Sequence, residues 1–178
     1  MIFMNIRIQL METLSRNIED HDLITKVIES RMRLIKEVWK EDSCSFYSSG
    51  YHVDSQTPFF TAFDDNKCIG LIILDEYPDD DEAKYYVRIY RLILLAEYQN
   101  CNVGELLLDE MEKYYKNNGK KMIYVTNDDN LICPNVFEWK LYKKAGFFGF
   151  DRRLITRRDR NHEIIERKVV YEYFIKII

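Results

Sequence analysis

The stretch from Tyr86 to Asn118 constrains the fold most, because it holds a strand, a tight polar loop and a helix in direct succession. Val87–Ala96 is mostly apolar and rich in β-branched and aromatic residues, which is typical of a buried strand. Gln99–Val103 is polar and predicts a turn. Gly104 then opens a segment in which apolar residues recur at helical spacing, namely Leu107, Leu108, Met111, Tyr114 and Tyr115. A chain built around this unit combines a sheet with helices.

The loop between this strand and helix has a physical use. The first amides of a helix have no internal partner and point outward at the positive end of the helix dipole. Such a site suits an anionic phosphate. Gly104 would let a ligand approach the backbone, and Asn102 is a residue type that tolerates a left-handed conformation. These residues indicate either a phosphate cradle or an ordinary β–α connection.

The same run also resembles a known family signature. The sequence LILLAEYQNCNVGELLL, Leu92–Leu108, is similar to motif A of the GCN5-related N-acetyltransferase (GNAT) family, Gln/Arg-x-x-Gly-x-Gly/Ala after a strand. Gln99 is the first signature residue and Gly104 the last. Asn102 stands where the first glycine is usual, so the motif departs from the family pattern at one position.

A second stretch resembles another GNAT signature. The sequence NVFEWKLYKKAGF, Asn135–Phe147, is similar to Asn-x-x-Ala-x-x-Leu/Phe-Tyr-x-x-x-Gly-Phe, with Glu138 in place of the alanine. The two signatures occur in the family's order, separated by segments that predict a helix and a strand. Together they are more specific than either alone, and the resemblance covers Phe59–Phe150 well.

Patterns along the chain predict the remaining elements. Strands are expected at Phe3–Leu10, Pro58–Phe63, Cys68–Glu76, Lys121–Thr126, Phe147–Ile155 and Lys168–Ile177, and helices at Asp22–Trp39 and from the N-cap Asn135 to Gly146. The fold class is therefore α/β, and 178 residues suit a single domain. The GNAT resemblance implies a central mixed, mostly antiparallel sheet flanked by helices and splayed between the fourth and fifth strands, where the coenzyme enters.

The resemblance also implies acyl transfer from acetyl-CoA to a primary amine of a small molecule or peptide. It assigns the pyrophosphate to the loop amides of Gln99, Asn100, Cys101, Asn102, Val103 and Gly104, and the pantetheine arm to Leu92, Ile93 and Leu94. Tyr142 would protonate the leaving thiolate. Asn135 would contact the pantetheine or the adenosine side, and Asn127 is a weaker candidate.

The general base stays open. Many family members carry a glutamate on the central strand, whereas this strand has Tyr90 and Arg91 there and no carboxylate before Glu97. Asp75, Glu76 or a chain of waters are the alternatives. The imperfect loop and the missing glutamate leave a second hypothesis, a non-catalytic acyl-CoA-binding sensor or interaction module of the same fold.

Composition limits the partners. The net charge of −4 argues against nucleic-acid binding and would suit a cationic substrate. No apolar run approaches the ~20 residues that span a bilayer, and the N-terminus lacks a secretory pattern, so a cytoplasmic protein without a membrane partner is expected. The four cysteines form no CxxC pair and cluster with no histidines, which predicts reduced thiols and no metal site.

Three further expectations concern a loop region near residue 50 and the C-terminal part of the chain. Tyr47, Tyr51 and His52 fall where this family often forms one wall of the acceptor pocket, although core or surface packing is the preferred interpretation for each. Thr156–Glu163 predicts a basic hairpin tip. The apolar C-terminal run VVYEYFIKII suggests a homodimer interface.

Overall fold

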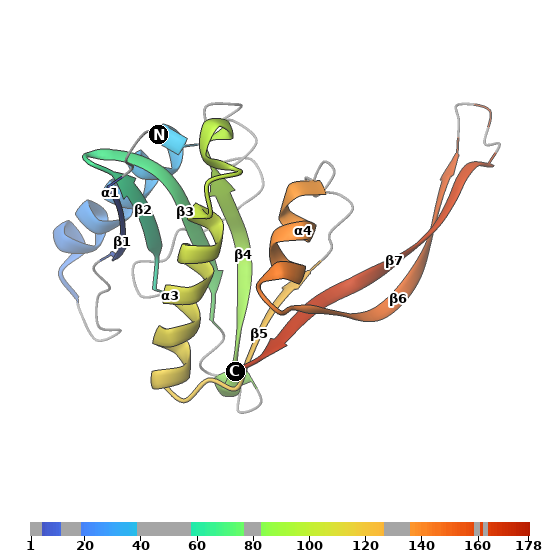
Figure 1. The fold of residues 1–178 in the computed structure, drawn as a ribbon. Helices are drawn as coiled ribbons and strands as arrows, with labels where there is room; N and C mark the ends of the chain where they lie inside the picture. The colour runs from blue at the N-terminus through green and yellow to red at the C-terminus, as the bar shows by residue number, and fades with distance from the viewer. Residues whose placement is uncertain are drawn as a thin grey trace.

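A single seven-stranded sheet organises the computed structural model, which describes residues 5–11, 19–38, 58–76, 83–126, 136–158, 161 and 164–178. The strand order is β1-β2-β3-β4-β5-β7-β6 (Figure 1). All neighbouring strands are antiparallel except β4 and β5, which are parallel. The α/β class and the mixed, mostly antiparallel sheet predicted from the sequence are therefore confirmed.

The elements follow the predicted order closely. The strands are β1 Ile6–Leu10, β2 Phe60–Asp64, β3 Lys67–Asp75, β4 Tyr86–Leu94, β5 Met122–Thr126, β6 Phe148–Arg158 and β7 Ile164–Ile177. The α-helices are α1 His21–Val38, α3 Val103–Asn117 and α4 Val136–Lys144. Two short 3₁₀ helices, η1 Ala83–Tyr85 and η2 Ala96–Tyr98, flank β4.

Local sequence explains the helix ends. The Asp20 carboxylate accepts a hydrogen bond of 3.0 Å from the Leu23 amide and caps the start of α1. Gly119, at φ 76°, follows the last turn of α3, and Gly146, at φ 88°, follows that of α4. Both positions need the left-handed backbone that glycine adopts without strain.

Helices α1 and α3 cover opposite faces of the sheet. Successive residues of an extended chain point to opposite faces of a sheet. The adjacent residues Phe59 and Phe60 accordingly contact different helices. The Phe60 ring lies 5.7 Å from the ring of Tyr114 on α3, whereas the Arg31 guanidinium of α1 lies 5.5 Å from the Phe59 ring. The core between α3 and the sheet includes the fully buried Leu107.

Some strand boundaries differ from the sequence-based expectation, most clearly at the end of the central strand and around the predicted hairpin tip. The central strand was predicted to reach Ala96, but it ends at Leu94 because Ala96–Tyr98 winds into η2. The residues from Thr156 were predicted as a hairpin tip, yet β6 continues to Arg158 and β7 begins at Ile164. Backbone pairing therefore continues past the predicted strand ends, with Arg157 in register with Glu166.

The C-terminal hairpin is only partly joined to the rest of the sheet. Strand β5 pairs with β7 from Tyr173 to Ile177, whereas the remainder of β7 pairs with β6 alone and extends away from the other strands (Figure 1). At the base of this hairpin Phe148 and Phe150 are exposed.

No helix among the described residues is long and apolar enough to cross a membrane.

Candidate functional site

Strands β4 and β5 separate halfway along β4. Their register runs from Tyr86 opposite Met122 to Ile89 opposite Val125 and then stops. Beyond that point the two strands diverge (Figure 1), so the peptide groups of Tyr90–Leu94 have no sheet partner on the β5 side among the described residues. The predicted splay between the fourth and fifth strands is thus confirmed.

A β-bulge marks where the strands part. On the other side of β4, Ile73 lies opposite Arg91 while Leu74 lies opposite Ile89, so Tyr90 is an extra residue in the ladder. A bulge of this kind bends its strand and increases its twist. The bend falls next to the last β4–β5 pair and explains why the strands part there.

The loop after β4 leads directly into the start of α3. Asn102 adopts φ 60° and ψ 4°, the left-handed conformation that the sequence suggested for it, and α3 begins at the next residue. Leu106 is the first residue whose amide reaches back to the Asn102 carbonyl, at 3.0 Å. The preceding amides at the start of α3 therefore point out of the helix at its positive end.

Four of the six predicted loop amides are available to a ligand. The Gln99 amide donates to the Ala96 carbonyl at 3.4 Å, and the Cys101 amide donates to the Tyr98 carbonyl at 3.2 Å. Among the described residues, the remaining loop amides donate to no backbone carbonyl, and these belong to Asn100, Asn102, Val103 and Gly104. The coenzyme contact predicted for the six loop amides stays a prediction, and these four amides are the ones without a backbone acceptor among the described residues.

Gly104 has a packing reason of its own. A Cβ atom built there would lie 2.5 Å from Leu141 Cδ2 and 3.2 Å from Leu94 Cδ1. The glycine therefore lets α4 pack against the first turn of α3, whereas the sequence suggested that it leaves room for a ligand. Its amide still lies at the helix start.

Tyr142 lies on α4 beside this contact. It follows Leu141, it is 1% exposed, and its ring lies 5.3 Å from that of Phe147. The structure thus places the predicted proton donor within the packed region between α4 and the sheet. The role of Tyr142 as a proton donor stays a prediction.

The two candidate bases lie in different surroundings. Asp75 pairs with Arg88 at 3.7 Å, and its pKa is raised by burial, an effect that the Arg88 charge opposes. Glu76 pairs with Lys120 at 3.9 Å, beyond the C-terminal end of α3. Asp75 lies directly opposite Arg88 of β4, the strand that carries the bulge, whereas Glu76 follows the end of β3 and is not part of the register.

The sequence did not identify the polar residues around the bulge as a group. The Tyr90 ring has the Arg88 and Arg91 guanidinium carbons each 5.6 Å from its centroid. Part of the signal was available in the sequence, because tyrosine and arginine side chains alternate with aliphatic ones in Tyr86–Tyr90, whereas Arg91 joins that face only through the bulge. Alternation within a buried strand indicates that one of its faces is polar.

Several predicted contacts lie outside the described residues. These are Asn135 and Asn127 for the coenzyme and Tyr47, Tyr51 and His52 for the acceptor.

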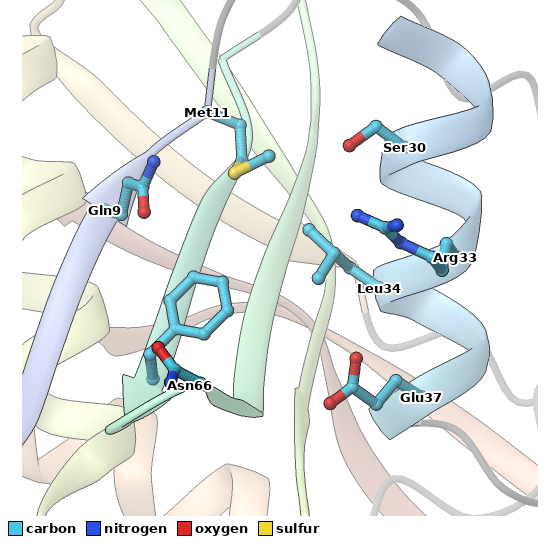
Figure 2. Close-up of a pocket in the computed structure, with 8 residues that line it drawn as sticks. Gln9, Met11, Ser30, Arg33, Leu34, Glu37 and Asn66 are labelled. Atoms are coloured by element: carbon cyan, nitrogen blue, oxygen red, sulfur yellow. The ribbon is translucent and has the colours of Figure 1, made fainter. Parts of the chain in front are cut away.

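A separate hollow of about 430 Å³ lies on the α1 side of the sheet. Figure 2 shows Gln9 of β1 and Met11, which directly follows β1, facing Arg33 and Leu34 of α1 across this space. None of the predicted site residues within the described ranges lines it. The hollow and the divergence of β4 from β5 are therefore distinct features.

Comparison with known proteins matches this geometry. The model of the Acetyltransferase (GNAT) family matches residues 24–147. The GNAT-family acetyltransferase from Streptococcus pneumoniae is 15% identical with a TM-score of 0.58, and the match covers 97% of this chain and 99% of that chain. No curated protein matches the sequence.

Two similar structures contain coenzyme. The acetyltransferase yncA from Salmonella typhimurium, with its cofactor acetyl-CoA, is 13% identical at a TM-score of 0.54, covering 97% of this chain and 93% of its own. The PaiA N-acetyltransferase from Thermoplasma acidophilum, in complex with coenzyme A, is 19% identical at a TM-score of 0.53, covering 98% of this chain and 100% of its own. At these identities the likeness concerns the fold alone.

Proposed function

Because the chain belongs to the GNAT acetyltransferase family, we propose that it transfers an acetyl group from acetyl-CoA to a primary amine of a small molecule or peptide. The observation that carries the proposal is the end of β4–β5 pairing at Ile89, next to a helix start with available amides. An unpaired strand edge and a cluster of helix-start amides are what an amide-containing arm and a diphosphate require.

The residues fit the coenzyme on two grounds. The amides of Asn102, Val103 and Gly104 stand at the positive end of a 15-residue helix, where a diphosphate is stabilised by hydrogen bonds and by the helix dipole. The edge of Leu92–Leu94 offers backbone donors and acceptors to an extended arm, as an added strand would use them. Acetyl-CoA supplies an activated thioester when bound there.

The chemistry asks the chain for two proton transfers. The amine nitrogen forms a bond to the acetyl carbon while the carbon–sulfur bond breaks, so the amine must lose a proton and the sulfur must gain one. We assign the proton for sulfur to Tyr142 and the proton from the amine to Asp75, directly or through water. A carboxyl whose pKa is raised by burial is a better base near neutral pH than an ordinary one.

A coenzyme-release assay with polyamines, amino acids, aminoglycosides and peptides tests the proposal. Tyr142→Phe should lower kcat by ~10²-fold or more while leaving coenzyme affinity nearly unchanged, because a general acid acts in the transition state. Tyr115→Phe is the matched control, since Tyr115 is also 1% exposed but lies on the second half of α3. Its kcat should stay close to that of the parent protein.

The outcomes separate an acetyltransferase, a coenzyme-binding module without catalysis and a protein that binds no coenzyme. Turnover that depends on Tyr142 supports the enzyme. Coenzyme binding without turnover across the panel would favour the sensor or interaction module. Coenzyme A should also raise the free energy of unfolding by ~2.7 kcal/mol at a hundredfold excess over the dissociation constant. The absence of any thermal shift would contradict both coenzyme-dependent functions.

A further inference from the structure

The bulge region of β4 has one apolar face and one polar face. Leu94 lies opposite Gly70, and a Cβ atom at Gly70 would lie 3.3 Å from Leu107 Cδ1, so Leu94 faces α3. Residues two apart share a face, which places Leu92 toward α3 and its neighbour Arg91 on the opposite face. Polar groups near the bulge therefore gather on the face away from α3.

Neighbouring strands contribute polar groups to the same face. Val125 is buried opposite Ile89, so Thr126, the next residue of β5, points to the other face. Asp75 and Arg88 lie in register and form their ion pair there. The face therefore combines residues from β3, β4 and β5 beside the point where β4 and β5 part.

Two hydrogen-bond donors on this face are buried and lack an acceptor in the part of the chain that the structure describes. Arg88 Nε and Thr126 Oγ1 are buried without a hydrogen-bond partner. Beside them, Arg91 is half-buried and contacts the Tyr90 ring, and no carboxylate among the described residues pairs with it. Because Asp75 balances the charge of Arg88, the described side chains on this face leave the charge of Arg91 unbalanced. Buried donors of this kind are normally satisfied, so their clustering indicates an anionic ligand.

We propose that the acceptor of the acetyl group carries a carboxylate as well as its amine, and that Arg91 binds this carboxylate. The inference rests on the proposed function, because that function makes the β4 edge the place where the acetyl group is presented. Helix α4 packs on the start of α3 through Leu141 and Gly104, which leaves the face away from α3 for the acceptor. The acceptor amine reaches the bulge while its carboxylate meets the Arg91 guanidinium.

The sign of the charge here differs from that of the whole chain. The net charge of −4 favoured a cationic substrate, whereas the bulge carries Arg91, which no carboxylate of the described ranges pairs with. A local charge at a half-buried position acts on a bound ligand more strongly than distant surface charges, which solvent and salt screen. The acceptor is thus an amino acid or a similar amino carboxylate.

The test compares matched acceptors that differ at one group. Straight-chain amino carboxylates, their carboxamides and the corresponding diamines are assayed for kcat/KM of coenzyme release, and their binding to the coenzyme A-loaded protein is measured by calorimetry. The carboxylate should be preferred over its carboxamide by about tenfold or more, the size of one charge-assisted hydrogen bond. Arg91→Gln should bring this ratio close to one, and Arg91→Lys should retain part of it.

Arg7→Gln provides the control. Arg7 also stacks on an aromatic ring, with its guanidinium carbon 5.3 Å from the Phe63 centroid, but it lies on β1, three strands and ~14 Å from β4. This variant should keep the full carboxylate preference. A carboxylate preference that survives Arg91→Gln, or turnover of all three acceptor types at equal kcat/KM, would overturn the inference and leave the acetyltransferase proposal standing. A parent protein that does not bind coenzyme A would overturn both the carboxylate inference and the acetyltransferase proposal.

Discussion

The two faces of β4 differ in what their side chains do. Toward α3, the strand presents Val87, Ile89, Leu92 and Leu94, all of which are buried in the hydrophobic core. Toward the other side it presents Arg88 and Arg91, which are only half-buried. One strand therefore supplies packing on one face and polar groups beside the strand divergence on the other.

This difference separates stability from recognition within a few residues. Apolar burial is worth ~25 cal/mol per Å² and depends little on direction, so the α3 face stabilises the fold through well-packed area. The polar face loses free energy by desolvating donors such as Arg88 Nε that have no partner among the described residues. Buried donors without a partner in the protein do not stabilise the fold. We expect them where a bound ligand provides the missing hydrogen-bond acceptor.

The largest expected effect is on the apolar face. Leu107→Ala should lower the free energy of unfolding by about 2–5 kcal/mol, because a fully buried leucine leaves a cavity under α3. Urea unfolding measures it, with the midpoint lowered and the slope unchanged. Arg91→Gln, on the polar face, should change the same free energy by less than about 1 kcal/mol, the size of an exposed cation–π contact. Equal losses from the two variants would remove the distinction between the faces.

The next effect concerns the contact between α3 and α4. Gly104→Ala should lower the free energy of unfolding by about 1–3 kcal/mol, because the new methyl group would meet Leu141 at 2.5 Å. Leu141→Ala removes that obstacle. The loss in the double variant should therefore be smaller than the sum of the single losses. Additive losses would contradict the view that Leu141 is what requires a glycine here.

The smallest effect is a pH dependence on the polar face. Burial raises the pKa of Asp75 above its ordinary value of 3.8, so the native state holds this proton after the unfolded state has released it. Stability from this group is present below pH 3.8 and is lost as pH rises through the raised pKa. Asp75→Asn cannot ionise and should remove this decline.

The difference between the unfolding free energies of Asp75→Asn and the parent protein, measured across the acidic range, isolates the term. The variant also lacks the ion pair with Arg88. This loss lowers the stability of the variant at high pH, so it acts against the effect of burial. A difference that moves against the variant throughout the range would mean that the ion pair outweighs burial at Asp75.

Much of the central unit followed from its sequence. The strand, the polar loop and α3 were predicted, and so was the left-handed backbone of Asn102. These features depend on neighbours within a few residues, through alternation, helical period and the residue types that tolerate positive φ. The extended β6–β7 ladder was missed because cross-strand pairs such as Arg157 and Glu166 are nine positions apart and offer no local signal.

The sequence by itself determined which residues form the strand, the loop and the helix, because those preferences are encoded locally. Tertiary structure alone decided where β4 leaves β5, why position 104 is a glycine, and that Arg88, Arg91 and Thr126 share one face. Each of these depends on pairing or packing between segments far apart in the chain. Such contacts form only when the whole sheet and its helices are assembled, so no local pattern could specify them.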